Sequence, residues 1–272
     1  MLFDDLDFSQ MEPSAFKLKT KAQSLAYGRY LYEYDDGIHH VWIKTQLLNH
    51  HLQFERGFQQ ELNFYEQSKK NGLERIVLAH AIINNKPNIP ELMFGQQSLV
   101  LPHAESIFNT SVLTLDITQV SHQILQVLNI LEKLHEKDCI HGDLKHEHFI
   151  KFDHAIKLLD FEQSFYVQDE ISHVLNATPR YMAPELFQGM TKSKASDIYA
   201  LGIILLEWLS QTRLQAKTYQ EWAVLHCQKL EILLPEQFLC FKPLLLMMLR
   251  KQKNQRVVDF STLKSCLIVD VV

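Results

Sequence analysis

Aromatic and polar positions alternate over about residues 15–45, most clearly in the stretch AYGRYLYEYDDGIHHVWIK. A period of two predicts half-buried strands, and the DDG sequence from Asp35 to Gly37 is typical of a tight turn. The pattern therefore predicts two strands joined as a hairpin.

Helical spacing replaces this alternation further along the chain. The stretch LQFERGFQQELNFYEQSKK predicts one amphipathic helix that ends near Gly72, since its apolar residues recur every three or four positions, at Phe54, Phe58, Leu62 and Tyr65. A short strand over 98–101 precedes a helix over 117–137 with an apolar stripe. The segment ASDIYALGIILLEWLS is apolar almost all round, which predicts a helix buried at the centre of a helical lobe.

These elements predict an α+β fold with two lobes. Residues 1–15 are expected to form an N-terminal tail, and residues 16–101 a small lobe with an antiparallel sheet and one helix. A polar hinge over 102–106 then leads to a larger, mainly helical lobe over 107–272.

Composition narrows the classes of function. The formal net charge of −5 and the absence of a dense Lys/Arg face argue against a nucleic-acid-binding protein. No apolar segment is long enough to span a membrane, and the acidic N-terminus lacks the pattern of a signal peptide. The cysteines form no CxxC pair and are expected to be buried thiols of a reducing compartment, which predicts a cytoplasmic protein; they are Cys139, Cys227, Cys240 and Cys266.

Polar residues crowd the stretch HGDLKHEHF at 141–149. Its histidines His141, His146 and His148, with His135 and Cys139 upstream, have the residue types of a zinc site. Their spacing matches no strong zinc signature, and solvated side chains explain such a group more often.

The order of the surrounding motifs favours another interpretation. HGDLKHEHFI followed by KLLDFE resembles the HRDLKxxN and DFG motifs of the protein kinase family. ATPRYMAPEL resembles the end of a kinase activation segment, SDIYALGIILLEWL the helix that supports the catalytic loop, and VWIK the third-strand lysine motif. The motifs occur in family order from about residue 20 to residue 260, so their combination is specific although each is weak alone.

The resemblance implies roles for five residues. Asp143 would accept the proton of the attacking hydroxyl, and Lys145 would lie beside the transferred phosphoryl group, as in serine/threonine kinases. Asp160 would bind Mg²⁺. Lys44 would contact the nucleotide phosphates and would be held in place by Glu61.

The resemblance also implies structural and nucleotide-binding residues. Thr178 would touch the catalytic aspartate, Asp197 would accept backbone N–H groups of the catalytic loop, and Glu185 would pair with Arg256. The residues expected to contact ATP are Gly28, Leu101, Pro102, Ala104 and Ile150.

Four departures from the family pattern bear on activity. The glycine-rich loop keeps only Gly28, with Gln23 and Leu25 at the first two glycine positions. Gly142 replaces the arginine that reads activation-loop phosphorylation, and Glu162 replaces the glycine of DFG, where it would restrict that segment or add a carboxylate near the metal. His148 replaces the metal-binding asparagine, as in the lipopolysaccharide core kinases, which phosphorylate sugars.

The resemblance thus implies a compact, bacterial-style phosphotransferase that uses ATP with Mg²⁺ or Mn²⁺, with His148 as a second candidate metal ligand. A serine/threonine protein kinase is the first hypothesis, because RYMAPEL and Thr178 belong to a platform for peptide substrates. The alternatives are a kinase that phosphorylates a sugar, glycolipid or other small molecule, and a pseudokinase that binds nucleotide or a partner without catalysis. The expected partners are a nucleotide and a hydroxyl acceptor, with no nucleic acid.

Overall fold

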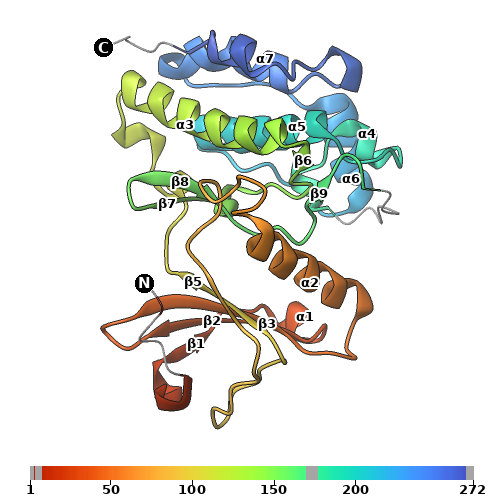
Figure 1. Cartoon of the computed structure of the whole chain (residues 1–272). Coiled ribbons are helices and arrows are strands. Elements are labelled where there is room, and N and C mark those ends of the chain that lie inside the picture. Colours follow the sequence, from red (N-terminus) through yellow and green to blue (C-terminus); the bar gives the residue numbers. More distant parts are fainter. Residues whose placement is uncertain (1–2, 4–7, 170–176, 268–272) are drawn as a thin grey trace. The chain divides into compact units, whose positions relative to one another are not determined.

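The predicted hairpin forms the middle of a five-stranded antiparallel sheet (Figure 1). The computed structural model describes residue 3 and residues 8–169 and 177–267. The strand order is β1-β2-β3-β5-β4, and Gly37 in the hairpin turn has a φ of +83°. The strands are β1 (Phe16–Leu18), β2 (Arg29–Asp35), β3 (His40–Gln46), β4 (Ala81–Ile83) and β5 (Ser98–Pro102).

The chain divides into two compact units. The N-terminal unit comprises Met1–Ala104 together with Leu159–Glu162, and the C-terminal unit comprises Glu105–Leu158 and Gln163–Val272. The division after Ala104 lies within the segment predicted as a hinge.

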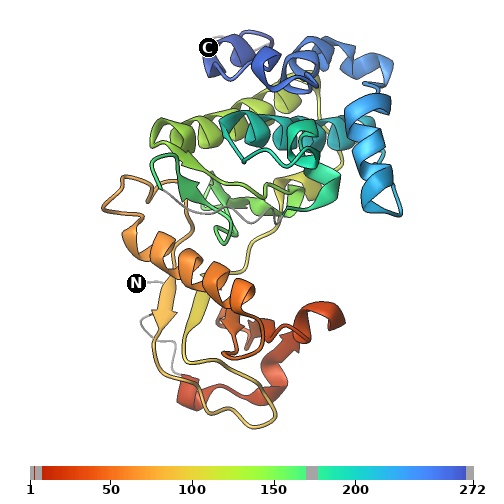
Figure 2. The ribbon, with the colours of Figure 1, turned by 90° about the vertical axis from the view of Figure 1, so that its right-hand side faces the viewer.

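Helix α2 (Leu52–Gln67) lies beside the sheet in the N-terminal unit, as Figures 1 and 2 both show. It ends at Gln67, five residues before the predicted end at Gly72. The Ser68 hydroxyl donates a hydrogen bond to the Tyr65 carbonyl, and the chain then turns through Gly72, whose φ is +69°. The helical periodicity of the sequence could not predict this local hydrogen bond, which competes with continuation of the helix.

A hydrophobic core lies on one face of the sheet, where aromatic and aliphatic side chains of β2, β3 and β5 meet. The segment predicted as an N-terminal tail contributes Met11, which is 7% exposed. The buried members of this core are Met11, Tyr32, Tyr34, Val41, Ile43, Ile89, Phe94 and Val100.

The connection between β1 and β2 contains a short helix, α1 (Ala22–Leu25), where the family has its glycine-rich loop. Gly28 follows this helix with a φ of +76°, and a Cβ atom at this position would lie 2.8 Å from Cβ of His50. Gly28 is therefore required by its backbone conformation and by close packing on His50.

The C-terminal unit is mainly helical, as predicted. Its longest helices are α3 (Ile117–Glu136) and α5 (Lys194–Ser210), which begin after capping boxes at Asp116 and Ser193. The shorter helices are α4 (Pro184–Phe187), α6 (Tyr219–Val224), α7 (Lys242–Met248) and α8 (Phe260–Lys264), and two small antiparallel pairs join β6 (Cys139–Ile140) to β9 (Phe165–Tyr166) and β7 (Phe149–Phe152) to β8 (Ala155–Leu158).

Helix α5 is buried along almost its whole length, in agreement with its apolar sequence. It packs against α7, and a Cβ atom on Gly202 would lie 2.8 Å from Cδ2 of Leu249. Gly202 therefore allows the two elements to approach closely. Within the described ranges, no helix combines the length and apolar composition needed to cross a bilayer.

The cysteines only partly match their predicted burial. All four are free thiols, and Cys139 is buried in β6. Cys227 and Cys266 are half-buried, however, and Cys240 is exposed. The prediction of buried thiols is therefore wrong for Cys240, because the 3-10 helix Glu236–Phe241 directs this side chain to solvent while the neighbouring Phe241 enters the core.

Candidate active site

The N-terminal unit places Lys44 among carboxylates. Lys44 Nζ lies 2.6 Å from Glu61 Oε2 and 3.0 Å from Asp160 Oδ1, so the structure joins the three residues that the sequence predicted to act together. Lys44 lies on β3, Glu61 on α2, and Asp160 in the segment Leu159–Glu162. The Lys44 side chain is 14% exposed and that of Glu61 is 1% exposed.

Glu61 shares a face of α2 with apolar residues. Phe58, Leu62 and Tyr65 lie three or four positions away and are buried with it. A carboxylate in such surroundings is costly unless a cation and hydrogen bonds compensate it. Lys44 supplies the cation, and the Phe161 backbone N–H donates to Glu61 Oε1 at 3.3 Å.

The neighbouring carboxylates raise the pKa values of both Lys44 and Glu61. Burial opposes the charge on Lys44, but the carboxylates of Asp160, Glu162 and Glu61 raise the pKa of its ammonium well above the ordinary value. The pKa of the Glu61 carboxyl is raised to about 7. Burial raises it most, the Asp160 and Glu162 carboxylates also raise it, and Lys44 lowers it. Lys44 therefore stays charged, whereas Glu61 binds a proton more readily than an exposed glutamate.

Glu162, the residue in place of the DFG glycine, is a third partner of Lys44. Its Oε1 lies 2.7 Å from Lys44 Nζ, and its Oε2 pairs with the guanidinium of Arg29. Arg29 begins β2, and its guanidinium lies 4.9 Å from the ring centre of Phe54. The sequence interpretation anticipated an added carboxylate at Glu162 but missed Arg29; the need of a buried glutamate for a cation is the signal that could have found it.

In the C-terminal unit, the carboxylate of Asp143 contacts Lys145 and Thr178. Its Oδ2 lies 2.8 Å from Lys145 Nζ, and its Oδ1 accepts a hydrogen bond from the Thr178 backbone N–H at 3.1 Å. These contacts orient the carboxylate and bring together the three residues that the sequence assigned to this part of the site. The predicted contact of Thr178 is made by its backbone N–H.

Asp197, at the start of α5, fixes the backbone just before Asp143. Its carboxylate accepts hydrogen bonds from the N–H groups of His141 at 2.8 Å and Gly142 at 3.0 Å, and lies 3.1 Å from His135 Nε2. Burial acts to raise the pKa of Asp197, but these bonds, that from His135 above all, hold it below the ordinary value. The predicted anchoring role of Asp197 matches this geometry.

Gly142 allows no side chain in this backbone conformation. Its φ is +79°, and a Cβ atom would lie 2.6 Å from the Gln163 carbonyl oxygen and 3.1 Å from Cδ of Lys192. An arginine at this position would require a different path for the loop. The loop thus lacks the family's arginine side chain, and its backbone conformation at this position also disfavours any side chain.

A buried pair also forms as predicted between Glu185 and Arg256. Arg256 Nη1 lies 2.6 Å from Glu185 Oε1, and Nη2 lies 2.9 Å from Oε2, so the contact is bidentate. Arg256 also donates to the carbonyls of Ala195 and Arg250. This pair joins α4 to the chain that follows α7.

The remaining predicted residues lie in both units. Leu101 and Pro102 belong to β5, and Ala104 ends the N-terminal unit, whereas Ile150 and the buried His148 belong to the C-terminal unit. Their roles toward a nucleotide or a metal stay predictions.

The zinc interpretation of the loop histidines gains no support. Among the described residues, metal-ligating atoms of His, Cys, Asp and Glu converge within 4.8 Å at two groups, Glu61–Asp160–Glu162 and Glu33–His40–His103. His141, His146 and His148 belong to neither group.

Comparison with known proteins agrees with this geometry. The sequence profile of the family described as "Protein kinase domain" matches residues 39–266. A probable serine/threonine-protein kinase from Dictyostelium discoideum is 27% identical over 155 residues, which are 57% of this chain and 11% of that protein. A membrane-associated tyrosine- and threonine-specific cdc2-inhibitory kinase from Drosophila melanogaster is 39% identical over 33% of this chain and 17% of its own length. An Aurora kinase from Schizosaccharomyces pombe is 34% identical over 33% of this chain and 25% of its own.

The chain thus spans a quarter or less of the length of these curated relatives. The family profile, in contrast, covers most of this chain and includes Lys44, Glu61, Asp143, Asp160 and Asp197. The chain belongs to the protein kinase family.

Proposed function

We propose that this chain is an ATP-dependent serine/threonine protein kinase that transfers the γ-phosphate of ATP to a hydroxyl group. The observation that carries the proposal is the position of Lys44 between Glu61 and Asp160. Charge stabilisation and positioning are the main demands of phosphoryl transfer, and this arrangement offers a fixed cation for phosphates beside a carboxylate for a metal.

The carboxylate oxygens present suit the metal. Mg²⁺ prefers oxygen ligands, and the oxygens of Glu61, Asp160 and Glu162 lie within 4.8 Å of one another. When bound with ATP, Mg²⁺ or Mn²⁺ would neutralise charge on the phosphates. Asp160 is the residue we assign to it, because its side chain is 28% exposed, whereas those of Glu61 and Glu162 are buried.

Asp143 is assigned as the proton acceptor. The Thr178 N–H and Lys145 hold its carboxylate, so that it is oriented for a hydroxyl that approaches. Lys145 would then stabilise charge that develops on the transferred group. The lysine at this position, and the serine/threonine kinases among the relatives, favour a protein hydroxyl as acceptor.

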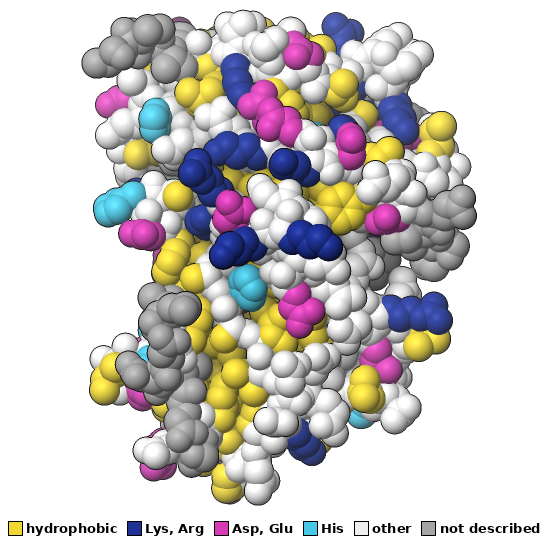
Figure 3. Space-filling view, viewed as in Figure 1, with side chains coloured by type: hydrophobic (Ala, Val, Ile, Leu, Met, Phe, Trp, Pro, Cys, Tyr) yellow, Lys and Arg dark blue, Asp and Glu magenta, His cyan; other side chains and the backbone are white. Residues whose placement is uncertain are grey.

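Charge on the visible surface gives no support to a nucleic-acid acceptor. In the space-filling view of Figure 3, Lys and Arg side chains lie among Asp and Glu side chains, in keeping with the net charge of −5. The cytoplasmic location inferred from the sequence stays a prediction.

Phosphate transfer from labelled ATP tests the proposal. The purified chain is incubated with Mg²⁺ or Mn²⁺ and panels of protein and sugar acceptors. Asp143→Asn should bind nucleotide normally and lose transfer by about 10³-fold or more. Lys44→Met should weaken productive nucleotide binding, and Lys17→Met, on the exposed strand β1, is the matched lysine control.

Three outcomes separate the alternatives. Transfer to proteins supports the proposal, and transfer only to sugars or other small molecules replaces it with the small-molecule kinase. Nucleotide binding without transfer to any acceptor would instead identify a pseudokinase.

A further inference from the structure

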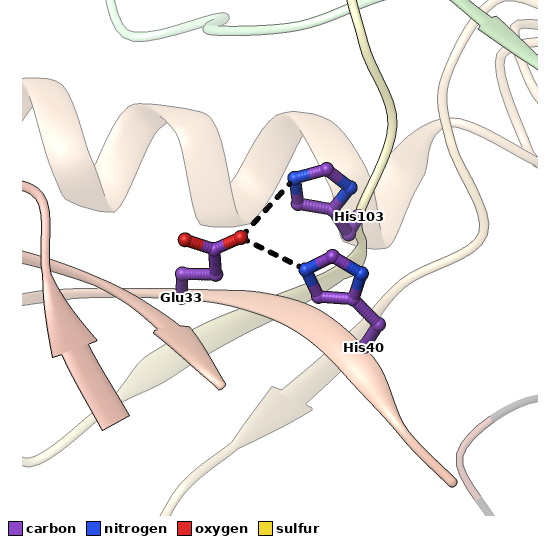
Figure 4. Close-up of side chains that lie close together, drawn as sticks. All are labelled: Glu33, His40 and His103. Carbon is purple, nitrogen blue, oxygen red and sulfur yellow. Dashed lines mark hydrogen bonds and ion pairs between the residues drawn. The ribbon is translucent and has the colours of Figure 1, made fainter. Parts of the chain in front are cut away.

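A second group of metal-ligating side chains lies near one end of the three inner strands of the N-terminal sheet, β2, β3 and β5. Glu33 Oε1 lies 2.9 Å from His40 Nε2 and 3.5 Å from His103 Nε2, and Figure 4 shows both rings directed toward that oxygen. Glu33 is on β2, His40 begins β3, and His103 follows β5 directly. Three adjacent strands therefore contribute one ligand atom each.

Backbone pairing holds the three residues in place. Trp42 is opposite Glu33 in the β2–β3 ladder, which makes His40 the diagonal neighbour of Glu33 on the same face. The His103 backbone N–H donates to the His40 carbonyl at 2.9 Å, and the two imidazole rings stack with centres 3.7 Å apart. Trp42 stacks on His103 with ring centres 4.9 Å apart, so the three rings form one aromatic stack.

The carboxylate is charged and has one oxygen directed at the histidines. Lys19 Nζ lies 2.5 Å from Glu33 Oε2, so this oxygen is occupied and Oε1 is the one that faces His40 and His103. The hydrogen bond from Lys19, with that from His40, lowers the pKa of Glu33 to about 2. The ammonium of Lys19 also opposes a second cation, so any metal site here is weaker than a fully buried structural site.

Distances and donor types suit a borderline transition metal. Zn²⁺ with ligands at about 2.0–2.2 Å in tetrahedral geometry requires ligand atoms roughly 3.3–3.6 Å apart. The oxygen–nitrogen distances are 2.9 and 3.5 Å, and all three ligand atoms lie within 4.8 Å of one another. Because the two imidazole planes are only 10° from parallel, one ring must rotate before both nitrogen lone pairs meet at the ion. Two imidazoles and one carboxylate form a known zinc donor set, with water as the fourth ligand.

We propose that Glu33, His40 and His103 form a binding site for Zn²⁺, with Glu33 Oε1 and the two Nε2 atoms as its ligands. Side-chain exposures of 18%, 40% and 20%, in that order, leave the site open to the ion and to a water ligand. Bound Zn²⁺ joins the β2–β3 hairpin to the segment after β5, and so stabilises the N-terminal unit by mass action. This site does not depend on the proposed kinase activity.

Zinc titration of the untagged, metal-free full chain tests the proposal. Isothermal calorimetry is run with excess Mg²⁺, so that carboxylate sites selective for Mg²⁺ are filled, and Co²⁺ absorption reports ligand geometry in parallel. One Zn²⁺ per chain is expected, with visible Co²⁺ bands of a tetrahedral site. Glu33→Gln, His40→Gln and His103→Gln should each weaken Zn²⁺ binding by at least tenfold.

His39→Gln is the matched control, because His39 is adjacent to His40 and contacts Asp36 instead of Glu33. Its zinc affinity should equal that of the wild type. Three single variants are used so that the failure of one to fold leaves two that give the same test. Wild-type affinity in the ligand variants, an equal loss in His39→Gln, or no zinc binding by the wild type would overturn the proposal, and the last result would leave a metal-free ion-pair cluster.

Discussion

The residues around Lys44 carry more negative than positive charge. Three carboxylates contact its ammonium, and Arg29 compensates only Glu162. Burial raises the pKa of the Glu61 carboxyl, and the surplus of negative charge from Asp160 and Glu162 raises it further, which is why it stays above the ordinary value even beside a lysine. A nucleotide brings further negative charge to this cluster, so the metal and Lys44 must offset it together.

The residues of this cluster differ in how far the sequence could predict them. Lys44, Glu61 and Asp160 occupy motif positions, so their order along the chain predicted their roles, and the structure places their side chains in contact. Arg29 follows no motif, because its role depends on which way the Glu162 side chain turns and on the strand that lies next to it. Such a contact is a tertiary property that single-sequence spacing does not contain.

Glu162 offers a test of this charge balance. We expect Glu162→Gln to bind ATP with Mg²⁺ about tenfold more tightly, because one negative charge beside the phosphates is removed and Arg29 is released. Glu61→Gln, the matched change, should weaken productive binding because Lys44 loses its buried partner. Calorimetric titration with ATP measures both, and weaker binding by Glu162→Gln would contradict this account.

At the scale of elements, the end of one helix fixes the backbone of the loop that contains Asp143. The N-terminus of α5 places Asp197 where it accepts the N–H groups of His141 and Gly142, so one helix sets the backbone that presents Asp143. Periodicity predicted α5 and its burial from the sequence alone. The left-handed conformation of Gly142 was not predictable, because the contacts of this backbone are with residues distant in sequence, such as the Asp197 carboxylate that accepts its N–H.

Two glycines separate the effect of backbone conformation from that of packing. Gly142 and Gly189 both have a φ of +79°, but a Cβ atom meets the Gln163 carbonyl at 2.6 Å in the first case and nothing within 4 Å in the second. Gly189→Ala should lower the free energy of unfolding by about 1 kcal/mol and preserve transfer. Gly142→Ala should lower it by about 2–4 kcal/mol and reduce transfer, because the loop before Asp143 must move.

Denaturant unfolding and phosphate transfer measure the two effects. Equal losses of stability in the two variants would show that the contact with Gln163 relaxes without cost. Normal transfer by a destabilised Gly142→Ala variant would show that the Asp143 carboxylate keeps its orientation despite the shift.

Sequence-based prediction succeeded best for segments with a periodic pattern, and it missed features that depend on contacts between individual side chains. The strand-rich N-terminal part and the long helices follow from periodicity and motif order. Helix α1 was not predicted, because AQSL is too short to show a period. The cluster of Glu33, His40 and His103 was also missed, since its members come together only through the pairing of three strands.

His148 lies in the C-terminal unit and Asp160 in the N-terminal unit, so their joint action on a metal is a prediction about the whole molecule. An imidazole in place of an amide oxygen should favour Mn²⁺ over Mg²⁺, because Mn²⁺ accepts nitrogen ligands more readily. His148→Asn should restore a preference for Mg²⁺, and His154→Asn, on an exposed turn, should not. Transfer rates in the two metals test this, and an unchanged rate ratio in His148→Asn would exclude His148 as a ligand.

Acid stability of the whole chain should depend on His226, which the proposed chemistry does not use. His226 is fully buried, its Nδ1 lies 2.9 Å from the Tyr199 hydroxyl, and the rings of Phe187 and Trp222 stack on it. Burial lowers its pKa to about 4, from 6.5 for an ordinary histidine. The unfolded chain therefore binds more protons between these pH values, and stability falls as the pH falls through this window.

A shift of this size corresponds to about 3 kcal/mol of unfolding free energy, which is present above pH 6.5 and lost by about pH 4. We expect His226→Gln, which keeps a polar partner for Tyr199 but does not titrate, to lose about 3 kcal/mol less than the wild type between pH 7.5 and 4. The exposed His122→Gln should behave as the wild type does. Urea unfolding of the three proteins at both pH values gives one loss of stability for each. Because the wild type and His226→Gln share every other titrating group, an equal loss in these two would mean that the buried imidazole already carries its proton in the folded state or gains water without unfolding.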